Sequence, residues 1–468
     1  MSSQDTPSSG GLDRALNGLG TLMIVLSAVT PASSVFIIVP GVIALAGTGS
    51  FLSFLFAAII GLFMAFVYAE LSSAYPTAGG EYTMIGRTLG RFWGFVTLVL
   101  VFISIVLIIA VVALGVGTYL GVLLPNLSAQ WVGVATIILA GIVAALRIKL
   151  NAFVTGIFLG IEMLALLILV VLGFINVERP LSSLFTAPQV LDAATNSLVP
   201  ASTGLILAAT AVAIFAYNGY GAAAYFGEET QDAKRSIGKV VLWALIITVA
   251  AELIPLTAVL LGSPDLAALL AAPAKIEYFL EARGGHTLTV VVSLAIAIAI
   301  FNAVIAIVLQ ASRLLFSSGR DKTWFGPINN AIASVHGTYA SPWIATIVVS
   351  VAAAVACFID LSLLLVVSGT SLVVIYALLC VAAVAGRRSG ATADGHYRMP
   401  LFPLPPILAF LALAYVGYQN WLDVAFGRPS LMATLAIMAI AAVYYAVFLA
   451  RRTDWTLHAP GEIEEIAG

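Results

Sequence analysis

The chain has 468 residues, of which 62% are hydrophobic and 9% charged, whereas a soluble domain has roughly 45–50% apolar and about 25% charged residues. This composition excludes an ordinary soluble domain and indicates an integral membrane protein. The net charge of −2 gives no reason to expect a nucleic-acid partner.

The apolar residues occur in runs of about twenty between short polar loops, as expected for helices that cross a hydrocarbon core about 30 Å thick. A membrane β-barrel would instead alternate apolar and polar residues. We therefore predict an all-α protein embedded in a lipid bilayer, with twelve spans and no loop large enough to fold alone. In chain order, these spans are Asn17–Ala46, Phe51–Ser73, Trp93–Leu124, Trp131–Leu146, Ala152–Phe174, Thr203–Gly227, Lys239–Leu261, Thr287–Ser312, Trp343–Ile359, Leu361–Gly386, Phe402–Trp421 and Leu431–Leu449.

Spans one and six are each interrupted near the middle by residues that disfavour helix, Thr30–Ser34 and Tyr217–Gly221. Irregular backbone survives inside a membrane only where protein or a wet cavity satisfies its freed N–H and C=O groups. Two such segments at corresponding places in two halves of a chain indicate a binding site near the bilayer midplane. The alternatives are a proline kink at Pro31 and close helix packing through the small residues that follow Gly221.

The spans divide into two groups of five, residues 17–175 and 203–386, and each group begins with an interrupted helix. Because an odd number of spans inverts the second group relative to the first, we predict two inverted repeats within a transmembrane domain of residues 17–450. Two extra helices occupy residues 402–449. Residues 1–16 and 451–468 are predicted to be terminal tails.

The basic residues predict the orientation of the chain. With the N-terminus in the cytoplasm, sixteen of the 20 lysine and arginine residues fall on the inner side; the exceptions are Arg179, Lys275, Arg283 and Arg428. This bias follows the positive-inside rule and requires an even number of spans. We therefore expect a multi-pass protein of the cell (inner) membrane with both termini cytoplasmic.

Two acidic residues lie inside predicted spans. Glu162 is near the centre of span five and Glu252 is at mid-depth in span seven. A carboxylate at such a depth costs several kcal/mol unless it is paired, wetted or protonated. We expect both to take part in proton coupling. For Glu162 the alternative is a structural bond to a neighbouring helix; for Glu252 it is either an anion that faces a cationic substrate or a wet outer-vestibule position.

Glu228 and Glu229 follow span six, close to Lys234 and Arg235. They form either a cytoplasmic salt-bridge gate or a solvated loop. The four histidines, His286, His336, His396 and His458, are scattered in loops and the tail, which gives no metal cluster and no catalytic group. With no phosphate-cradling motif either, we expect no enzyme activity and no cofactor.

Three stretches resemble the amino acid, polyamine and organocation (APC) transporter superfamily. They are Tyr68–Tyr82, with the sequence YAELSSAYPTAGGEY; Phe215–Arg235, which contains the second interruption and an acidic-then-basic loop; and Ser312–Asp321, with the sequence SRLLFSSGRD. The resemblance covers essentially the whole chain. It implies ten core helices in two inverted repeats, and secondary active transport of amino acids or related amines by an amino acid permease.

The resemblance also implies a substrate clamped between the two interruptions. The corresponding positions are Thr30, Ala32, Ser33 and Ser34 in span one, and Phe215, Ala216, Tyr217, Asn218 and Tyr220 in span six.

The sodium site of this fold uses paired hydroxyls in span eight, but here that span has no serine or threonine between Ser293 and Ser312. We therefore expect a proton-coupled amino acid importer that works by alternating access. A polyamine or amine transporter, or an amino acid/amine antiporter, is the alternative, and either a monomer or a homodimer is compatible with the sequence.

Overall fold

The computed structural model describes residues 12–121, 128–192, 195 and 197–458. The end of predicted span three at Leu124 and the outer parts of both predicted tails fall outside these residues. The first half contains α1 (Gly18–Val29), α2 (Pro31–Ser33), η1 (Ser34–Ile38), α3 (Val39–Ala46), η2 (Gly47–Gly49), α4 (Ser50–Ala74), α5 (Glu81–Leu89), α6 (Arg91–Gly121), α7 (Ala129–Ala144), α8 (Ile148–Ile175), α9 (Ser183–Thr186), β1 (Gln189–Asp192) and β2 (Ser197–Pro200). The second half contains α10 (Thr203–Ala216), η3 (Tyr220–Phe226), α11 (Ala233–Gly262), α12 (Leu266–Ala271), α13 (Lys275–Arg320), α14 (Gly326–Ile332), α15 (Trp343–Ala356), α16 (Leu361–Ser389), α17 (Leu404–Leu422), α18 (Gly427–Tyr444) and η4 (Tyr445–Leu449).

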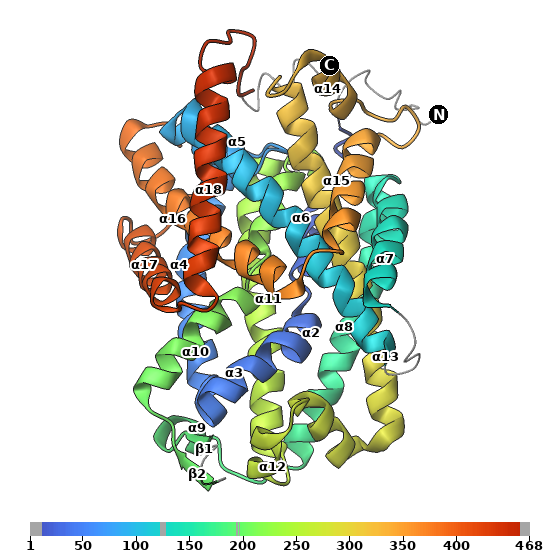
Figure 1. The fold of residues 1–468 in the computed structure, drawn as a ribbon, viewed down its shortest axis with the longest axis vertical. Helices are drawn as coiled ribbons and strands as arrows, with labels where there is room; N and C mark the ends of the chain where they lie inside the picture. Colours follow the sequence, from blue (N-terminus) through green and yellow to red (C-terminus); the bar gives the residue numbers. More distant parts are fainter. Residues whose placement is uncertain (1–11, 122–127, 193–194, 196, 459–468) are drawn as a thin grey trace.

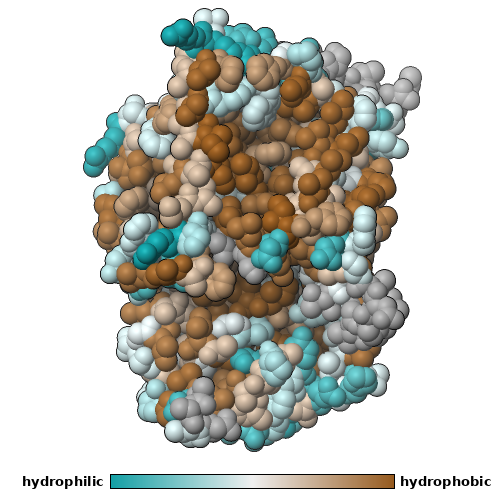
Figure 2. Space-filling view, viewed as in Figure 1, coloured by the Kyte–Doolittle hydropathy of each residue, from teal (hydrophilic) through white to brown (hydrophobic). Residues whose placement is uncertain are grey.

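The long helices run roughly along the long axis of the molecule (Figure 1). Helices α5 and α14 lie at one end, and the β1–β2 hairpin and α12 lie at the other. Helix α4 packs along α11, and α13 packs against both α6 and α8, so elements far apart in the sequence share one core. Apolar side chains dominate the middle of the visible surface, and polar ones gather towards both ends of the molecule (Figure 2).

Among the described residues, eight helical stretches are long and apolar enough to cross a membrane, which supports the prediction of an all-α, multi-pass membrane protein. The number differs from the predicted twelve spans for identifiable reasons. Predicted spans one and two count as one of the eight stretches, Gly18–Ala74, because no loop separates them. Predicted spans four and nine are the shorter helices Ala129–Ala144 and Trp343–Ala356. Predicted span eleven corresponds to α17, which is outside the eight.

Both predicted interruptions are present. Thr30 ends α1 in the left-handed region, with φ 49° and ψ 70°, and Pro31 begins α2 immediately after it. This conformation is rare for a β-branched residue, while a proline without an N–H suits the first position of a helix. In span six, α10 ends at Ala216, and the chain continues through Gly219 at φ 120° into the tight helix η3.

The connection between α8 and α10 contains a short hairpin that the sequence does not indicate. Strands β1 and β2 pair antiparallel within it, with Val190 opposite Val199. The hairpin is attached to the turn between α3 and α4, because the amide of Gln189 donates to Thr48 Oγ1 at 2.8 Å. A four-residue strand stabilised by such a remote hydroxyl has little local signal in the sequence.

The first residues of the predicted C-terminal tail are packed against the core. Trp455 is buried, its Nε1 donates to the Tyr82 hydroxyl at 3.3 Å, and its ring contacts Phe95 edge-on. The amide of Thr456 donates to the Asp321 carbonyl at 3.3 Å. This segment therefore links α5, α6 and the end of α13.

Candidate substrate and proton site

The two interruptions touch each other in the middle of the protein. A Cβ atom added to Gly219 would lie 2.9 Å from the Cα of Val29, so only glycine permits this approach of η3 to the end of α1. The Ser34 hydroxyl donates to the carbonyl of Ala216, the last residue of α10, at 3.1 Å. The structure thus brings together Ser34 and Ala216, two of the predicted substrate residues.

Glu162, on α8, binds the interruption of span one. Its Oε1 accepts a hydrogen bond from the Ala32 amide at 2.8 Å and one from the Thr30 hydroxyl at 3.2 Å. Its Oε2 is buried without a partner among the described residues. One carboxyl oxygen therefore accepts a hydrogen bond from an amide that the broken helix leaves free, while the other oxygen makes no hydrogen bond to the described residues.

Glu252, on α11, lies on the other side of the same interruption. Both of its carboxyl oxygens are buried, and the carboxyl group interacts with the Ser34 hydroxyl and electrostatically with Glu162. The nearby hydroxyl of Tyr217 is buried without a hydrogen-bond partner among the residues that the structure describes. The side chain of Glu252 has no solvent exposure, so the predicted alternative of a wet outer-vestibule position is wrong.

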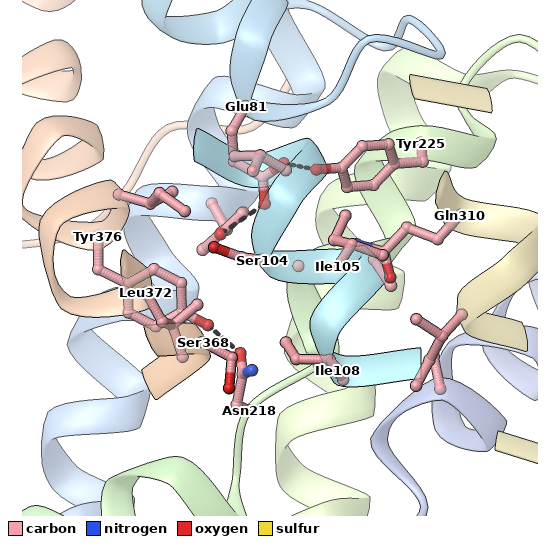
Figure 3. Close-up of a pocket in the computed structure, with 18 residues that line it drawn as sticks. Glu81, Ser104, Ile105, Ile108, Asn218, Tyr225, Gln310, Ser368, Leu372 and Tyr376 are labelled. Carbon is pink, nitrogen blue, oxygen red and sulfur yellow. Dashed lines mark hydrogen bonds between the residues drawn. The ribbon is translucent and has the colours of Figure 1, made fainter. Parts of the chain in front are cut away.

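A cavity of about 90 Å³ lies on the other face of η3 (Figure 3). Of the nine predicted substrate residues, only Asn218 lines this cavity. The neighbouring glycines Gly219 and Gly221, which were not predicted, line it too. Asn218 Oδ1 accepts a hydrogen bond from the Tyr376 hydroxyl at one end of the cavity. Most of the remaining wall is apolar and comes from α6, α13 and α16.

The other predicted substrate residues lie around this cavity rather than in its wall. Thr30 and Ala32 contact Glu162, while Ser33 and Ser34 belong to the buried turn that follows. Tyr217 and Tyr220 line a smaller hollow between α4 and α17, and Phe215 is half-buried near the end of α10.

Most residues that line the cavity were missed by sequence reasoning, among them Glu81, Tyr68 and Tyr225. Glu81, the first residue of α5, lines the cavity opposite Asn218, and its two oxygens accept hydrogen bonds from the hydroxyls of Tyr68 and Tyr225. The motif Gly79–Tyr82 was recognised only as part of a family pattern. A charged residue directly after the glycine pair Gly79–Gly80 is a weak sign of a functional position. Nothing in the local sequence indicates that α5 reaches a cavity.

Glu228 and Glu229 are paired with remote arginines rather than with Lys234 and Arg235. Arg313 on α13 makes two hydrogen bonds to Glu229, both of 2.8 Å, and neither side chain has any exposed surface. Arg320, about two turns further along α13, makes hydrogen bonds of 2.7 and 2.9 Å to Glu228. Both glutamates are buried, so the alternative of a solvated loop is wrong.

Glu228 also accepts a hydrogen bond from the amide of Ala78 at 2.8 Å, which ties the loop before α5 to the end of η3. Burial alone would raise the pKa of the Glu228 carboxyl, but the Arg320 guanidinium and the Ala78 amide outweigh burial and hold this pKa below its usual value.

Asn302, one of the few polar residues of predicted span eight, has a structural contact. Its Nδ2 donates to the Ser27 hydroxyl at 2.9 Å and to the Thr155 carbonyl at 3.2 Å. It therefore joins α13 to α1 and α8, directly beside the interruption of span one.

Comparison with known proteins identifies the family. The family model described as amino acid permease matches residues 16–450. An uncharacterized transporter of Mycobacterium tuberculosis is 27% identical over 442 residues, which cover 94% of this chain and 90% of the relative. The branched-chain amino acid permease BcaP of Bacillus subtilis is 23% identical over 419 residues, covering 86% of this chain and 85% of the relative. The serine/threonine exchanger SteT of the same bacterium is 23% identical over 421 residues, covering 87% and 91%. The family match spans nearly the whole chain, and the chain therefore belongs to the amino acid permease family of the APC superfamily.

Proposed function

We propose that this protein is a secondary active transporter that imports amino acids across the cell membrane and couples this import to protons. Its family and its relatives support amino acid transport. The observation that carries the coupling proposal is the contact between Glu162 and the interruption of span one, where a buried carboxyl group has no cationic partner among the described residues.

Proton uptake would change this contact in a defined way. An ionised carboxylate is a stronger acceptor than a neutral carboxyl group, by roughly a factor of two in hydrogen-bond energy. Protonation of Glu162 would therefore weaken its hold on the Ala32 amide and loosen the junction between α1 and α2. Glu252, which is buried and interacts electrostatically with Glu162, would exchange the proton with it.

Alternating access would then proceed by movement of the two interrupted spans relative to the rest of the bundle. The close contact between Val29 and Gly219 supports a joint movement of both interruptions. On the inner side, the pairs Glu228–Arg320 and Glu229–Arg313 would serve as a gate that opens when η3 moves away from α13.

The proposal includes the predicted topology. Twelve spans, arranged as two inverted repeats plus two extra helices, place sixteen of the 20 basic residues on the side of both termini. The shorter helices α7 and α15 count as spans in this arrangement. Cysteine labelling tests this topology. A single cysteine is introduced near one terminus or the other, and intact cells are treated with a membrane-impermeant thiol reagent. If both termini are cytoplasmic, neither cysteine should react.

Uptake into liposomes tests the coupling. The purified full-length protein should accumulate labelled leucine under an inward proton gradient and lose accumulation when the gradient is collapsed. Glu162→Gln keeps an acceptor for the Ala32 amide but cannot titrate. It should abolish gradient-driven accumulation while exchange of internal for external leucine continues. The matched control is Glu281→Gln, because the side chain of Glu281 is 61% exposed and lines neither cavity.

Unchanged gradient-driven uptake by Glu162→Gln would refute the coupling role of Glu162. Absence of any uptake or exchange by the wild-type protein across the aliphatic amino acids would refute the proposed import itself. Obligate exchange is the second candidate, since one relative is named a serine/threonine exchanger. It predicts uptake only into liposomes that are preloaded with amino acid, whatever the proton gradient.

A further inference from the structure

A short segment after η4 crosses the end of the molecule where α5 and α14 lie (Figure 1). We call residues 455–458 the strap. On one side the strap is attached to the residue that follows α13. The Thr456 amide donates to the Asp321 carbonyl at 3.3 Å, and His458 Nδ1 lies 2.7 Å from Asp321 Oδ1. The backbone and a side chain of the strap therefore both hold the end of α13.

On its other side the strap is attached to α5. Trp455 is buried and donates from Nε1 to the Tyr82 hydroxyl at 3.3 Å. The carbonyl of Leu457 accepts a hydrogen bond from the Arg87 guanidinium. A Cβ atom added to Gly86 would lie 2.8 Å from Leu457 Cδ1, so the leucine side chain packs directly on the backbone of α5. The strap thus joins α5 to α13.

Helix α5 is in turn joined to η3, the second half of the interrupted span six. The Ala78 amide, in the loop before α5, donates to Glu228 at 2.8 Å, and Glu81 accepts a hydrogen bond from the Tyr225 hydroxyl of η3. If η3 moves away from α13, it either breaks these bonds or takes α5 with it. Movement of α5 away from α13 requires release of the strap.

We propose that the strap is an autoinhibitory contact that holds the inner side of the transporter closed, and that its release favours opening towards the cytoplasm. This inference rests on the proposed function, since it takes the pairs Glu228–Arg320 and Glu229–Arg313 as the inner gate. The two pairs join η3 to α13 inside the bundle, whereas the strap closes the same gate across its end.

Trp455 makes the contact strong enough to shift a conformational equilibrium. Its ring meets Phe95 and Tyr445 edge-on, at centroid distances of 6.4 and 5.8 Å, and the Arg91 guanidinium lies 5.7 Å from the ring centre. Loss of a buried tryptophan side chain usually shifts an equilibrium by more than about a hundredfold. Contacts that are made in the closed state and lost in the open state shift the populations by their own free energy.

The rate at which a thiol reagent modifies Ser317→Cys measures opening of the gate. Ser317 is 1% exposed and lies where α13 meets the loop before α5, because a Cβ added to Gly79 would be 3.0 Å from its hydroxyl oxygen. The chain has two native cysteines, Cys357 and Cys380, and both are buried. The same protein without Ser317→Cys therefore gives the background and reports any general loosening.

The labelling rate is compared in purified full-length protein, well below the melting midpoint of each variant. Trp455→Ala should raise the rate at Ser317→Cys at least about tenfold. His458→Ala removes only the contact with the Asp321 side chain and should raise the rate about twofold to tenfold, the usual effect of one hydrogen bond. The matched control is Trp243→Ala, because Trp243 is 56% exposed on α11, and its rate should equal that of the wild type.

Unchanged labelling in both strap variants would overturn the inference. An equal rise at the buried native cysteines would also overturn it, because the strap would then only stabilise the fold. His458→Ala alters a partly exposed side chain and decides the matter even if Trp455→Ala does not fold. Labelling needs neither substrate nor a proton gradient. Leucine uptake with unchanged labelling would therefore refute the strap alone, whereas the expected labelling without any uptake would refute the proposed import alone.

Discussion

Replacement of Arg313 by glutamine should cause a large loss of stability. Arg313 and Glu229 have no exposed surface and share two hydrogen bonds of 2.8 Å. The arginine also donates to Ser312 Oγ at 3.1 Å and lies over the ring of Phe226, 5.8 Å from its centre. Without Arg313, the Glu229 carboxylate would remain buried with no cation to neutralise it.

The expected magnitude follows from this geometry. Removal of one partner of a buried ion pair costs about 3–5 kcal/mol, because a charge is left uncompensated. An unfolding entropy of about 2.1 cal/mol/K per residue gives about 1 kcal/mol/K for 468 residues. The melting midpoint of Arg313→Gln should therefore fall by about 3–5 °C.

Thermal melting of the purified protein in detergent measures this loss. The double variant Arg313→Gln/Glu229→Gln should recover part of it, because no charge is then buried. The control is Arg235→Gln, whose partner Asp232 lies 3.9 Å away and whose side chain is 64% exposed. This exposed pair should contribute less than about 1 kcal/mol. A midpoint of Arg313→Gln within 1 °C of the wild type, or a double variant as unstable as the sum of the two single variants, would refute the reasoning.

Two further predictions concern the inner pair and the second interruption. Because the pKa of folded Glu228 lies below its ordinary value of 4.5, its pair with Arg320 should stabilise the protein above that pH and lose this effect as the pH falls through the lowered pKa. The difference in melting midpoint between wild type and Glu228→Gln should accordingly be constant from about pH 7 to pH 5 and shrink below it; a difference that grows on acidification would contradict this sign. Gly219→Ala should cost at least about 1–3 kcal/mol and abolish uptake, since its φ is 120° and the new Cβ would meet the backbone of Val29. Gly417→Ala, which has open space for a Cβ in α17, is the control, and equal effects of both replacements on melting and uptake would show that the close approach does not matter.

The sequence by itself determined the class of protein and the position of its irregular backbone. Long apolar runs require helices in a membrane because lipid cannot satisfy free backbone groups. Pro31 cannot donate a backbone hydrogen bond and Gly219 permits a positive φ, so both interruptions were predictable from local chemistry. The cost of burying a carboxylate likewise singled out Glu162 and Glu252 before any contact was known.

Only the tertiary structure decided which groups meet. The binding of Glu162 to the Ala32 amide joins residues 130 positions apart, and the pair of Arg313 and Glu229 joins residues 84 positions apart. The nearest cations in the sequence, Lys234 and Arg235, suggested a different pairing. Glu81 gave no local sign that it lines a cavity, because that position depends on how α5 packs against α6 and α16. Helix formation depends on neighbours a few residues away, whereas the partner of a buried charge depends on the packing of whole helices, and the sequence encodes that packing only through many weak contacts.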